Sequence, residues 1–226
     1  TCWELASIAP VCDVNGIVTH YITVKENITD RKILEEDLIR QNNLLILLMR
    51  LASGFINVPI DGVDAAIHKA LKELADFVQA DRSYIFEYDW ENQLCSNTYE
   101  WCAEGIPPEI DNLQNLPFSI MGHWPETHAK GEAIYIPDLF LLPKAMIREM
   151  LEAQNIKSLL AVPMMMNGKC VGFVGFDSVR QHHHYSVADQ QLLQVFAQVL
   201  TNVRLRKEMI DSLMLAKQSL EDSERK

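Results

Sequence analysis

The stretch from Ser158 to Val179 reads SLLAVPMMMNGKCVGFVGFDSV, and it predicts a β-hairpin around which the fold is organised. Two apolar runs flank the dipeptide Asn167-Gly168. Both central residues of a type I′ turn need a positive φ angle, which Asn and Gly tolerate well. A two-residue turn at this place fixes the register, and the expected pairs are Met166 with Lys169, Met164 with Val171, and Val162 with Phe173.

The register also predicts which side chains share a face of the sheet. Because successive side chains of a strand point to opposite faces, one face is expected to carry Val162, Met164, Val171 and Phe173, and the other Ala161, Pro163, Met165, Cys170, Gly172 and Val174. Both sets are apolar, which indicates a sheet covered on both sides. Pro163 has no N–H for the strand ladder, so we expect a local irregularity beside it.

The composition is that of an acidic globular protein. The 226 residues are 48% hydrophobic and carry a formal net charge of −11, which argues against nucleic acid and anionic membranes as partners. The longest apolar run, Leu44 to Met49, is far shorter than the roughly 20 residues of a membrane-spanning helix, so we expect no direct membrane contact. Five cysteines without C-x-x-C spacing indicate reduced thiols and a cytoplasmic location. The first residue is Thr, and we interpret the chain as a piece of a longer protein.

The N-terminal segment, residues 1–30, contains two β-type runs. They cover Trp3–Val11 and Ile17–Glu26, flank the turn dipeptide Asn15-Gly16, and lead into the sequence NITDRK. In this order of features the segment resembles the C-terminal end of a PAS domain (the PAC motif), where the last two strands run into Asp-Ile-Thr and a signalling helix. Asn27 stands in the position of that Asp and keeps a hydrogen-bonding carbonyl without the charge. The resemblance implies a truncated sensor domain whose own ligand pocket is mostly absent.

A linker helix is expected over residues 31–57. Its apolar residues alternate in steps of four and three, as in the seam of a coiled coil: Leu34, Leu38, Leu45, Leu48, Ala52 and Phe55. Such a seam either packs on the helix's own domain or pairs with a second helix. We favour the coiled coil for the first half, because little else is present to bury it.

The last helix is expected to begin near Ser186, at a near capping box, and to carry a second seam. Its half at residues 207–226 has no further domain to cover it, so a second copy of the chain is the simplest partner. We therefore expect a homodimer, with a helix seam made of Leu34, Leu38, Leu45, Leu48, Val203, Ile210, Leu213 and Leu220.

The apolar pattern between these helices predicts an α+β fold with an antiparallel sheet. We expect a helix at 61–79, strands at 83–90 and 93–102, a long loop at 103–122, a short helix at 123–130, a strand at 133–136 and a helix at 143–154.

Residues 44–206 carry the motifs EWCAEGI, GEAIYIPD, SLLAVPMMMNGKCVGFVGFD and SVADQQLL. With these motifs the segment resembles a GAF domain, a fold related to PAS domains. The resemblance implies a sheet with helices on one face and a small-molecule pocket on the other. It also implies a bacterial multidomain signalling protein, of sensor histidine kinase or diguanylate cyclase type. The chain itself has no kinase Gly-rich loop and no GGDEF motif.

Six residues are candidate contacts of a ligand in such a pocket: Trp101, His123, Trp124, His128, Met164 and Phe173. Each has a structural alternative, since Trp and Met also fill cores and a single His is more often hydrogen-bonded structure than a haem ligand. The sequence does not identify a cofactor. His182–His184 is interpreted as a solvated loop, so no metal site is expected, and no set of nucleophile, base and orienting residue indicates catalysis.

Two specialised kinds of GAF domain are disfavoured by the cysteines. Cys95 and Cys102 are seven residues apart on one expected strand and should point to opposite faces, which counts against a free methionine sulfoxide reductase. Some GAF domains attach a bilin to a Cys in the segment that corresponds to residues 119–130, and this segment has no Cys here.

These observations predict a sensory GAF module that binds a small molecule, mediates dimerisation, or does both. It would relay a signal through its helices to an output domain outside this chain. The alternatives left open are an enzyme of the sulfoxide reductase type and a structural dimerisation spacer without a ligand.

Overall fold

The computed structural model describes residues 2–56 and 58–224, and the chain divides into two compact units, residues 1–49 and 50–226. Helix α1 (Thr29–Ile56) begins in the first unit and ends in the second.

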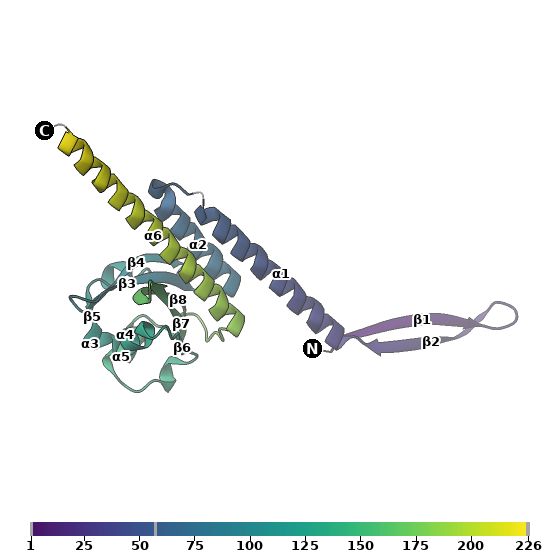
Figure 1. The fold of residues 1–226 in the computed structure, drawn as a ribbon. Helices are drawn as coiled ribbons and strands as arrows, with labels where there is room; N and C mark the ends of the chain where they lie inside the picture. Colours follow the sequence, from purple (N-terminus) through teal and green to yellow (C-terminus); the bar gives the residue numbers. More distant parts are fainter. Residues whose placement is uncertain (1, 57, 225–226) are drawn as a thin grey trace. The chain divides into compact units, whose positions relative to one another are not determined.

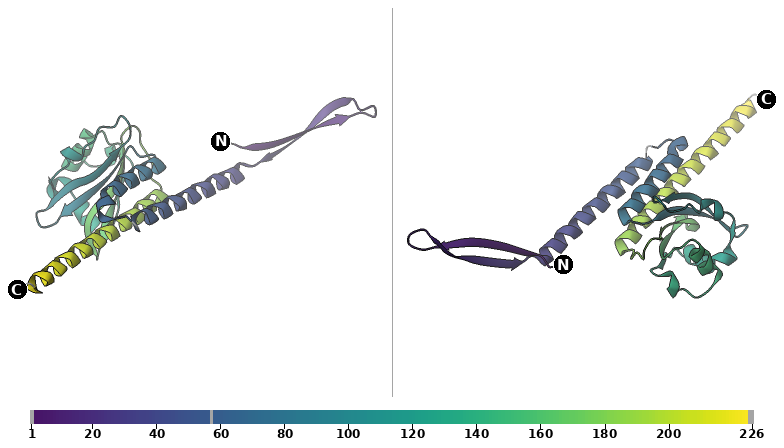
Figure 2. Two further views of the ribbon diagram at one scale, coloured as in Figure 1. Left: turned by 90° about the horizontal axis from the view of Figure 1, so that it is seen from above. Right: turned by 180° about the vertical axis from the view of Figure 1, so that it is seen from behind.

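The first unit is an antiparallel hairpin that leads into α1 (Figure 2). Its strands are β1 (Glu4–Cys12) and β2 (Val18–Asn27). The Asp13 carboxylate closes the turn by accepting hydrogen bonds from the N–H groups of Asn15 and Ile17, at 2.8 and 2.9 Å. At the other end, Oδ1 of Asn27 accepts a 3.0 Å hydrogen bond from the N–H of Thr29. Asn27 therefore satisfies a free N–H at the start of α1, and this needs a carbonyl oxygen but no charge.

The second unit is a six-stranded antiparallel sheet covered on both faces (Figure 1). The strands follow the order β5-β4-β3-β8-β7-β6, so the β7–β8 hairpin lies inside the sheet as predicted. The strands are β3 (Arg82–Asp89), β4 (Leu94–Cys102), β5 (Leu116–Pro117), β6 (Ile134–Ile136), β7 (Ser158–Met166) and β8 (Lys169–Ser178).

Helices and loops form the two outer layers of this unit (Figure 1). We call the face under α2 (Val63–Val78) and α6 (Val187–Glu224) the helix face. The opposite face, under α3 (Phe118–Met121), α4 (Trp124–Ala129) and α5 (Met146–Ala153), is called the loop face. The expected helices and strands appear in the predicted order, and the α+β fold with an antiparallel sheet is confirmed. The segment expected to be a loop, 103–122, however also contains β5 and α3.

The register predicted for the central hairpin is wrong by one residue beyond the first two pairs after the turn. Met166 pairs with Lys169 and Met165 with Cys170, but Met164 pairs with Gly172 and not with Val171. Val171 is the extra residue of a β-bulge. Beyond the bulge, Val162 pairs with Val174 and Pro163 with Phe173.

The bulge moves Phe173 to the face opposite to the one predicted. Its ring lies 5.7 Å from the ring of Trp124, on the loop face, whereas Met164 and Val171 border a pocket on the helix face. Gly172 permits the bulge, since a Cβ there would lie 2.0 Å from the carbonyl oxygen of Phe86. Counting residues from a turn cannot reveal such an insertion.

A second bulge corrects the prediction for Cys95 and Cys102. Between Ile85 and Phe86 the register of β3 against β4 shifts, so that Cys95 pairs with Tyr88 and Cys102 with Arg82. Side chains at alternate positions of β3 share a face, so both cysteines lie on the same face. They are still far apart, because the six-residue step between their partners spans about 20 Å along a strand.

Helix α6 has a covered part and an uncovered part. Leu192, Phe196, Leu200 and Val203 are buried, whereas Met209, Leu213 and Met214 are all more than half exposed. The first half of α6 therefore packs on the sheet, and the second half continues beyond it.

Candidate functional site

The loop face contains an aromatic cluster centred on Phe173. Its ring stacks on that of Phe86 at 4.8 Å and lies within 6 Å of the rings of Tyr88, Trp124 and His128. The five side chains come from strands β3 and β8 and from helix α4, and all are buried. The position that the GAF resemblance assigns to a ligand pocket is therefore occupied by the protein's own rings.

A buried polar network borders this cluster. Tyr84 donates a 2.8 Å hydrogen bond to Oδ1 of Asp177, and Arg82 Nε lies 3.7 Å from Oδ2 of the same carboxylate. The guanidinium of Arg82 also donates a 3.0 Å hydrogen bond to the carbonyl of Gln154. Burial raises the pKa of Asp177 to about 6, although the positive charge of Arg82 acts in the opposite direction. Burial, together with the Asp177 charge, also raises the pKa of Tyr84.

His128 is the buried titratable base of the cluster. Its Nδ1 shares a 2.8 Å hydrogen bond with the hydroxyl of Tyr88. Its Nε2 has no partner of hydrogen-bond geometry within the described residues. The backbone carbonyl of Ala161 acts to raise the pKa of the ring, because it favours the protonated form. Burial dominates and lowers the pKa of His128 to about 4, so the ring is neutral near pH 7.

The space left between cluster and network is small. A cavity of about 20 Å³ is bordered by Tyr84, Asn97, Trp124, Phe173 and Asp177, among others. This is about the room that one water molecule needs. Oδ1 of Asn97 is buried without a hydrogen-bond partner in the described part of the chain, and a water here would satisfy it. The cavity does not fit a haem or a bilin.

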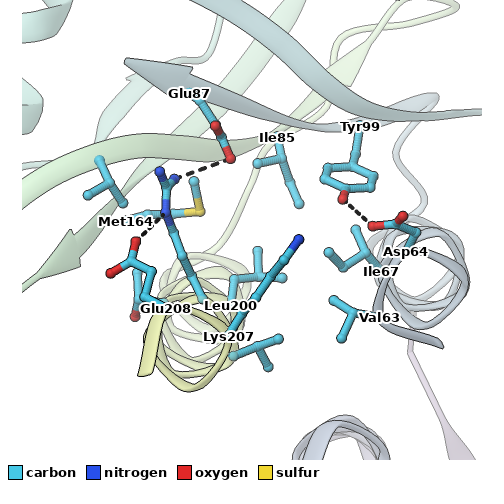
Figure 3. Close-up of a pocket in the computed structure, with 14 residues that line it drawn as sticks. Val63, Asp64, Ile67, Ile85, Glu87, Tyr99, Met164, Leu200, Lys207 and Glu208 are labelled. Atoms are coloured by element: carbon cyan, nitrogen blue, oxygen red, sulfur yellow. Dashed lines mark hydrogen bonds and ion pairs between the residues drawn. The ribbon is translucent and has the colours of Figure 1, made fainter. Parts of the chain in front are cut away.

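The helix face has a larger pocket, of about 340 Å³, between α2, α6 and the sheet (Figure 3). Its floor is apolar and includes Ile67, Ile85, Met164 and Leu200. All four side chains are buried, so the pocket reaches into the layer between helices and sheet.

Charged side chains surround the mouth of this pocket. Arg204 lies between two carboxylates, 3.2 Å from Glu87 and 3.4 Å from Glu208. Across the pocket, Tyr99 donates a 2.5 Å hydrogen bond to Asp64 (Figure 3). Burial and this bond to Asp64 raise the pKa of Tyr99 to about 12.

The six predicted ligand contacts fall into different places. Trp124, His128 and Phe173 come together in the aromatic cluster. Met164 lies on the helix face, and Trp101 lies under the ammonium group of Lys72 from α2, at 5.4 Å. His123 is exposed at the start of α4. The interpretation of these residues as ligand contacts stays a prediction.

Sequence reasoning identified part of each site but missed several polar residues of the loop face. Tyr84, Tyr88 and Asp177 lie in strands where only apolar periodicity was considered. Asp177 has a recognisable signal, because it is a carboxylate at the end of an apolar strand and such a group needs a buried partner.

The C-terminal end of α1 meets the middle of α6 at Arg206. Its guanidinium donates hydrogen bonds to the carbonyls of Phe55, Ile56 and Val58, at 3.2, 2.8 and 2.8 Å. The rings of Phe55 and Phe196 lie 6.2 Å apart beside it. Arg206, which interrupts the predicted seam, thus caps the C-terminal end of α1.

The predicted seam residues are unequally covered. Leu34, Leu38, Leu45 and Leu213 are exposed, Leu48 and Ile210 are half-buried, and Val203 is buried against the sheet. The side chain of Leu220 lies outside the described residues.

Neither a metal site nor a membrane span is found in the described residues. None of their His, Cys, Asp and Glu side chains form a group of three or more that could hold a metal ion. His184 instead shares a 2.9 Å hydrogen bond with the hydroxyl of Tyr135. No described helix is both long and apolar enough to cross a bilayer.

Comparison with known proteins gives a family and a relative. The family model described as "GAF domain" matches residues 62–203. The methanogenesis regulatory histidine kinase FilI of Methanothrix harundinacea (strain 6Ac) is 31% identical over 222 residues. The match covers 94% of this chain and 24% of the relative, so the chain spans about a quarter of that protein.

Solved structures with a similar fold include chromophore-binding domains. The blue-light absorbing form of the PixJ GAF domain of Thermosynechococcus elongatus has a TM-score of 0.56 at 19% identity, over 67% of this chain and 92% of that one. The chromophore-binding domain of the bacteriophytochrome RpBphP3 from R. palustris has a TM-score of 0.60 at 15% identity, over 77% of this chain and 64% of that one. At these identities the likeness concerns the fold.

Proposed function

Since the chain belongs to the GAF domain family, we propose that it is the sensory and relay module of a signalling protein of histidine kinase type. A ligand or an upstream sensor domain would shift the packing of α1 and α6, and α6 would carry this shift to an output domain in the cytoplasm. The module itself performs no catalysis in this proposal.

The observation that carries the proposal is the division of α6 into two parts. Its first part supplies buried residues to the sheet, and the same uninterrupted helix then continues with exposed apolar residues. A helix is stiff along its axis, so a change in how the first part packs moves the second part as well.

The incoming helix supports the same mechanism. Three backbone carbonyls in or just after its last turn are held by Arg206 of α6. A rotation or shift of the end of α1 therefore acts directly on the exit helix. The alignment with a histidine kinase extends over nearly the whole chain, which supports the same succession of hairpin, helix, GAF domain and exit helix in both proteins.

Dimerisation is the second part of the proposal. Leu34, Leu38, Leu45 and Leu213 are each at least 59% exposed in a single chain. Apolar residues spaced as a coiled-coil seam are stabilised by burial against a second helix. The simplest source of that helix is a second copy, arranged around a twofold axis.

The mass of the chain in solution tests the dimer. Light scattering at micromolar concentration should give twice the chain mass of 25.8 kDa. The variant Leu213→Glu should shift the mass toward the monomer, while Val187→Glu, at an exposed apolar position in the first turn of α6, should not. A wild-type monomer would contradict this part of the proposal.

The two alternative functions, a sulfoxide reductase and a structural spacer without a ligand, differ in their support. The distance along the strand between Cys95 and Cys102, and the raised pKa values of both thiols, disfavour a sulfoxide reductase. A spacer without a ligand is favoured by one observation, the aromatic filling of the loop face. Native mass spectrometry of the protein from its own host would separate it from a ligand-binding module.

A further inference from the structure

The pocket under α2 and α6 has the properties of a ligand site on the face where none is expected. The GAF resemblance assigns the ligand to the loop face, but there the cavity holds about 20 Å³, against about 340 Å³ on the helix face. Pockets for small molecules start at roughly 300 Å³ and are mostly apolar with a few placed polar groups.

The floor of the pocket suits an aliphatic group. Ile67, Ile85, Met164 and Leu200 come from four different elements and offer only carbon and sulfur atoms through their side chains. Met164 is an adaptable wall, since its unbranched thioether can rearrange around a guest.

The polar groups of the mouth are paired, with one exception. Glu87 and Glu208 hold Arg204, and Asp64 holds the Tyr99 hydroxyl. Lys207 has no ion pair or hydrogen bond within the described residues. Figure 3 shows its ammonium group turned into the space between α6 and the Tyr99–Asp64 pair.

An unpaired ammonium beside an apolar floor selects an anion with an apolar body. A ligand amine would meet the positive charge of Lys207, and the carboxylates at the mouth already have Arg204 or the Tyr99 hydroxyl as partners. A ligand carboxylate meets Lys207 without breaking either pair. The net charge of −11 opposes anions at long range, but at physiological salt charges beyond about 8 Å are largely screened.

We propose that this pocket binds a small aliphatic carboxylate, with the chain on the Ile85–Met164 floor and the carboxylate on Lys207. The guest would lie between α2 and α6 and alter the packing of the exit helix. That effect on the relay rests on the proposed function, whereas the binding itself does not.

The test uses sodium octanoate as the probe, with octanol and octylamine as its neutral and cationic counterparts. The nine methionines, labelled at the methyl carbon, report the place of binding by NMR. Octanoate should shift the Met164 signal, assigned with Met164→Leu, and leave that of Met121 on the loop face unchanged. It should bind at least about threefold more tightly than octanol, as a partly exposed ion pair allows, and octylamine should bind most weakly.

Lys207→Gln is the decisive variant. It should remove the preference for octanoate over octanol and keep octanol binding, whereas Lys169→Gln, at the exposed first residue of β8, should change neither. Equal binding of octanoate and octanol to the wild type, a shift of Met121 in place of Met164, or no shift at all would overturn the inference. If octanoate does not bind but the chain is a dimer, the ligand site is refuted and the proposed relay is not. If octanoate binds as predicted but the chain is a monomer, the dimer of the proposed function is refuted and the ligand site is not.

Discussion

Arg206 of the exit helix donates a 2.8 Å hydrogen bond to the backbone carbonyl of Ile56, the last residue of the incoming helix. The carbonyls at the end of a helix lack partners and carry the negative end of its dipole, so a guanidinium is well suited to cap them. This contact explains a charged residue in a seam of apolar ones. It also joins the two helices through which the proposed signal enters and leaves.

Replacing Arg206 should weaken the contact between α1 and α6 without disturbing the sheet. Arg206→Gln removes the charged donor from three carbonyls, so the free energy of unfolding should fall by about 1–2 kcal/mol, reduced from the buried case because the side chain is half exposed. Arg206→Lys keeps the positive charge but not the forked donor geometry of the guanidinium. Its free energy of unfolding should therefore lie between those of the wild type and Arg206→Gln. Urea denaturation measures the free energy of unfolding of all three proteins. Equal stability of wild type and Arg206→Gln would contradict a capping role.

His128 should make the protein sensitive to mild acid. Its pKa is about 4 in the folded chain and near 6.5 when unfolded, so between these values the unfolded state binds more protons. The free energy of unfolding therefore falls as the pH drops from 6.5 to 4, by at most about 3 kcal/mol from this residue. Asp177, whose pKa rises to about 6 on folding, has the opposite effect over part of this range.

The variant His128→Gln isolates the histidine contribution, because Asp177 acts equally in both proteins. Denaturation at a series of pH values should give a flatter curve below pH 6.5 for the variant than for the wild type. Parallel curves would show that His128 is not held neutral by burial.

Gly172 should be far more sensitive to substitution than a glycine in a helix. The Cβ of Gly172→Ala would meet the Phe86 carbonyl at 2.0 Å, and the resulting backbone shift should cost about 3 kcal/mol or more. Gly54→Ala is the control, since nothing lies within 4 Å of its Cβ in α1, and helix propensity favours it by about 1 kcal/mol. Thermal unfolding compares the two, and a benign Gly172→Ala would mean that the bulge is absent.

Bilins should not attach to this domain, in spite of its likeness to chromophore-binding folds. Residues 119–130 contain no Cys, and the loop-face cavity of about 20 Å³ is too small for a tetrapyrrole. Chain produced together with biliverdin should show no zinc-induced fluorescence on a denaturing gel. A fluorescent band that is lost in Cys95→Ser would contradict the filled loop face directly.

The sequence predicted the elements well, because their signals are local. Asn167-Gly168, the Ser186 capping region and the 3.6-residue period of α2 each determine structure within a few residues. The buried hairpin followed from two apolar faces. The motifs around it led to the family that the comparison then showed.

What the sequence did not give was the outcome of the two bulges. Val171 and the shift between Ile85 and Phe86 each add one residue to a strand, and each reverses every side chain beyond it. Phe173 was therefore assigned to the wrong face, and Cys95 and Cys102 were wrongly expected on opposite faces. The same shift hides which candidates meet, since Met164 and Phe173 look like neighbours on one face until the bulge separates them.

The pairing of α6 with a second copy is the claim that most needs a direct measurement. In a parallel dimer around a twofold axis, Leu213 would face Leu213 of the other copy, at a Cα separation that a disulfide tolerates, about 4.4–6.8 Å. With the exposed Cys2 and Cys12 replaced by Ser, Leu213→Cys should form a covalent dimer under mild oxidation, while Ser212→Cys at the preceding helix position should not. Rapid cross-linking at 213 alone is the predicted result. Equal cross-linking at both positions, or none at 213, would contradict a relay built on paired exit helices.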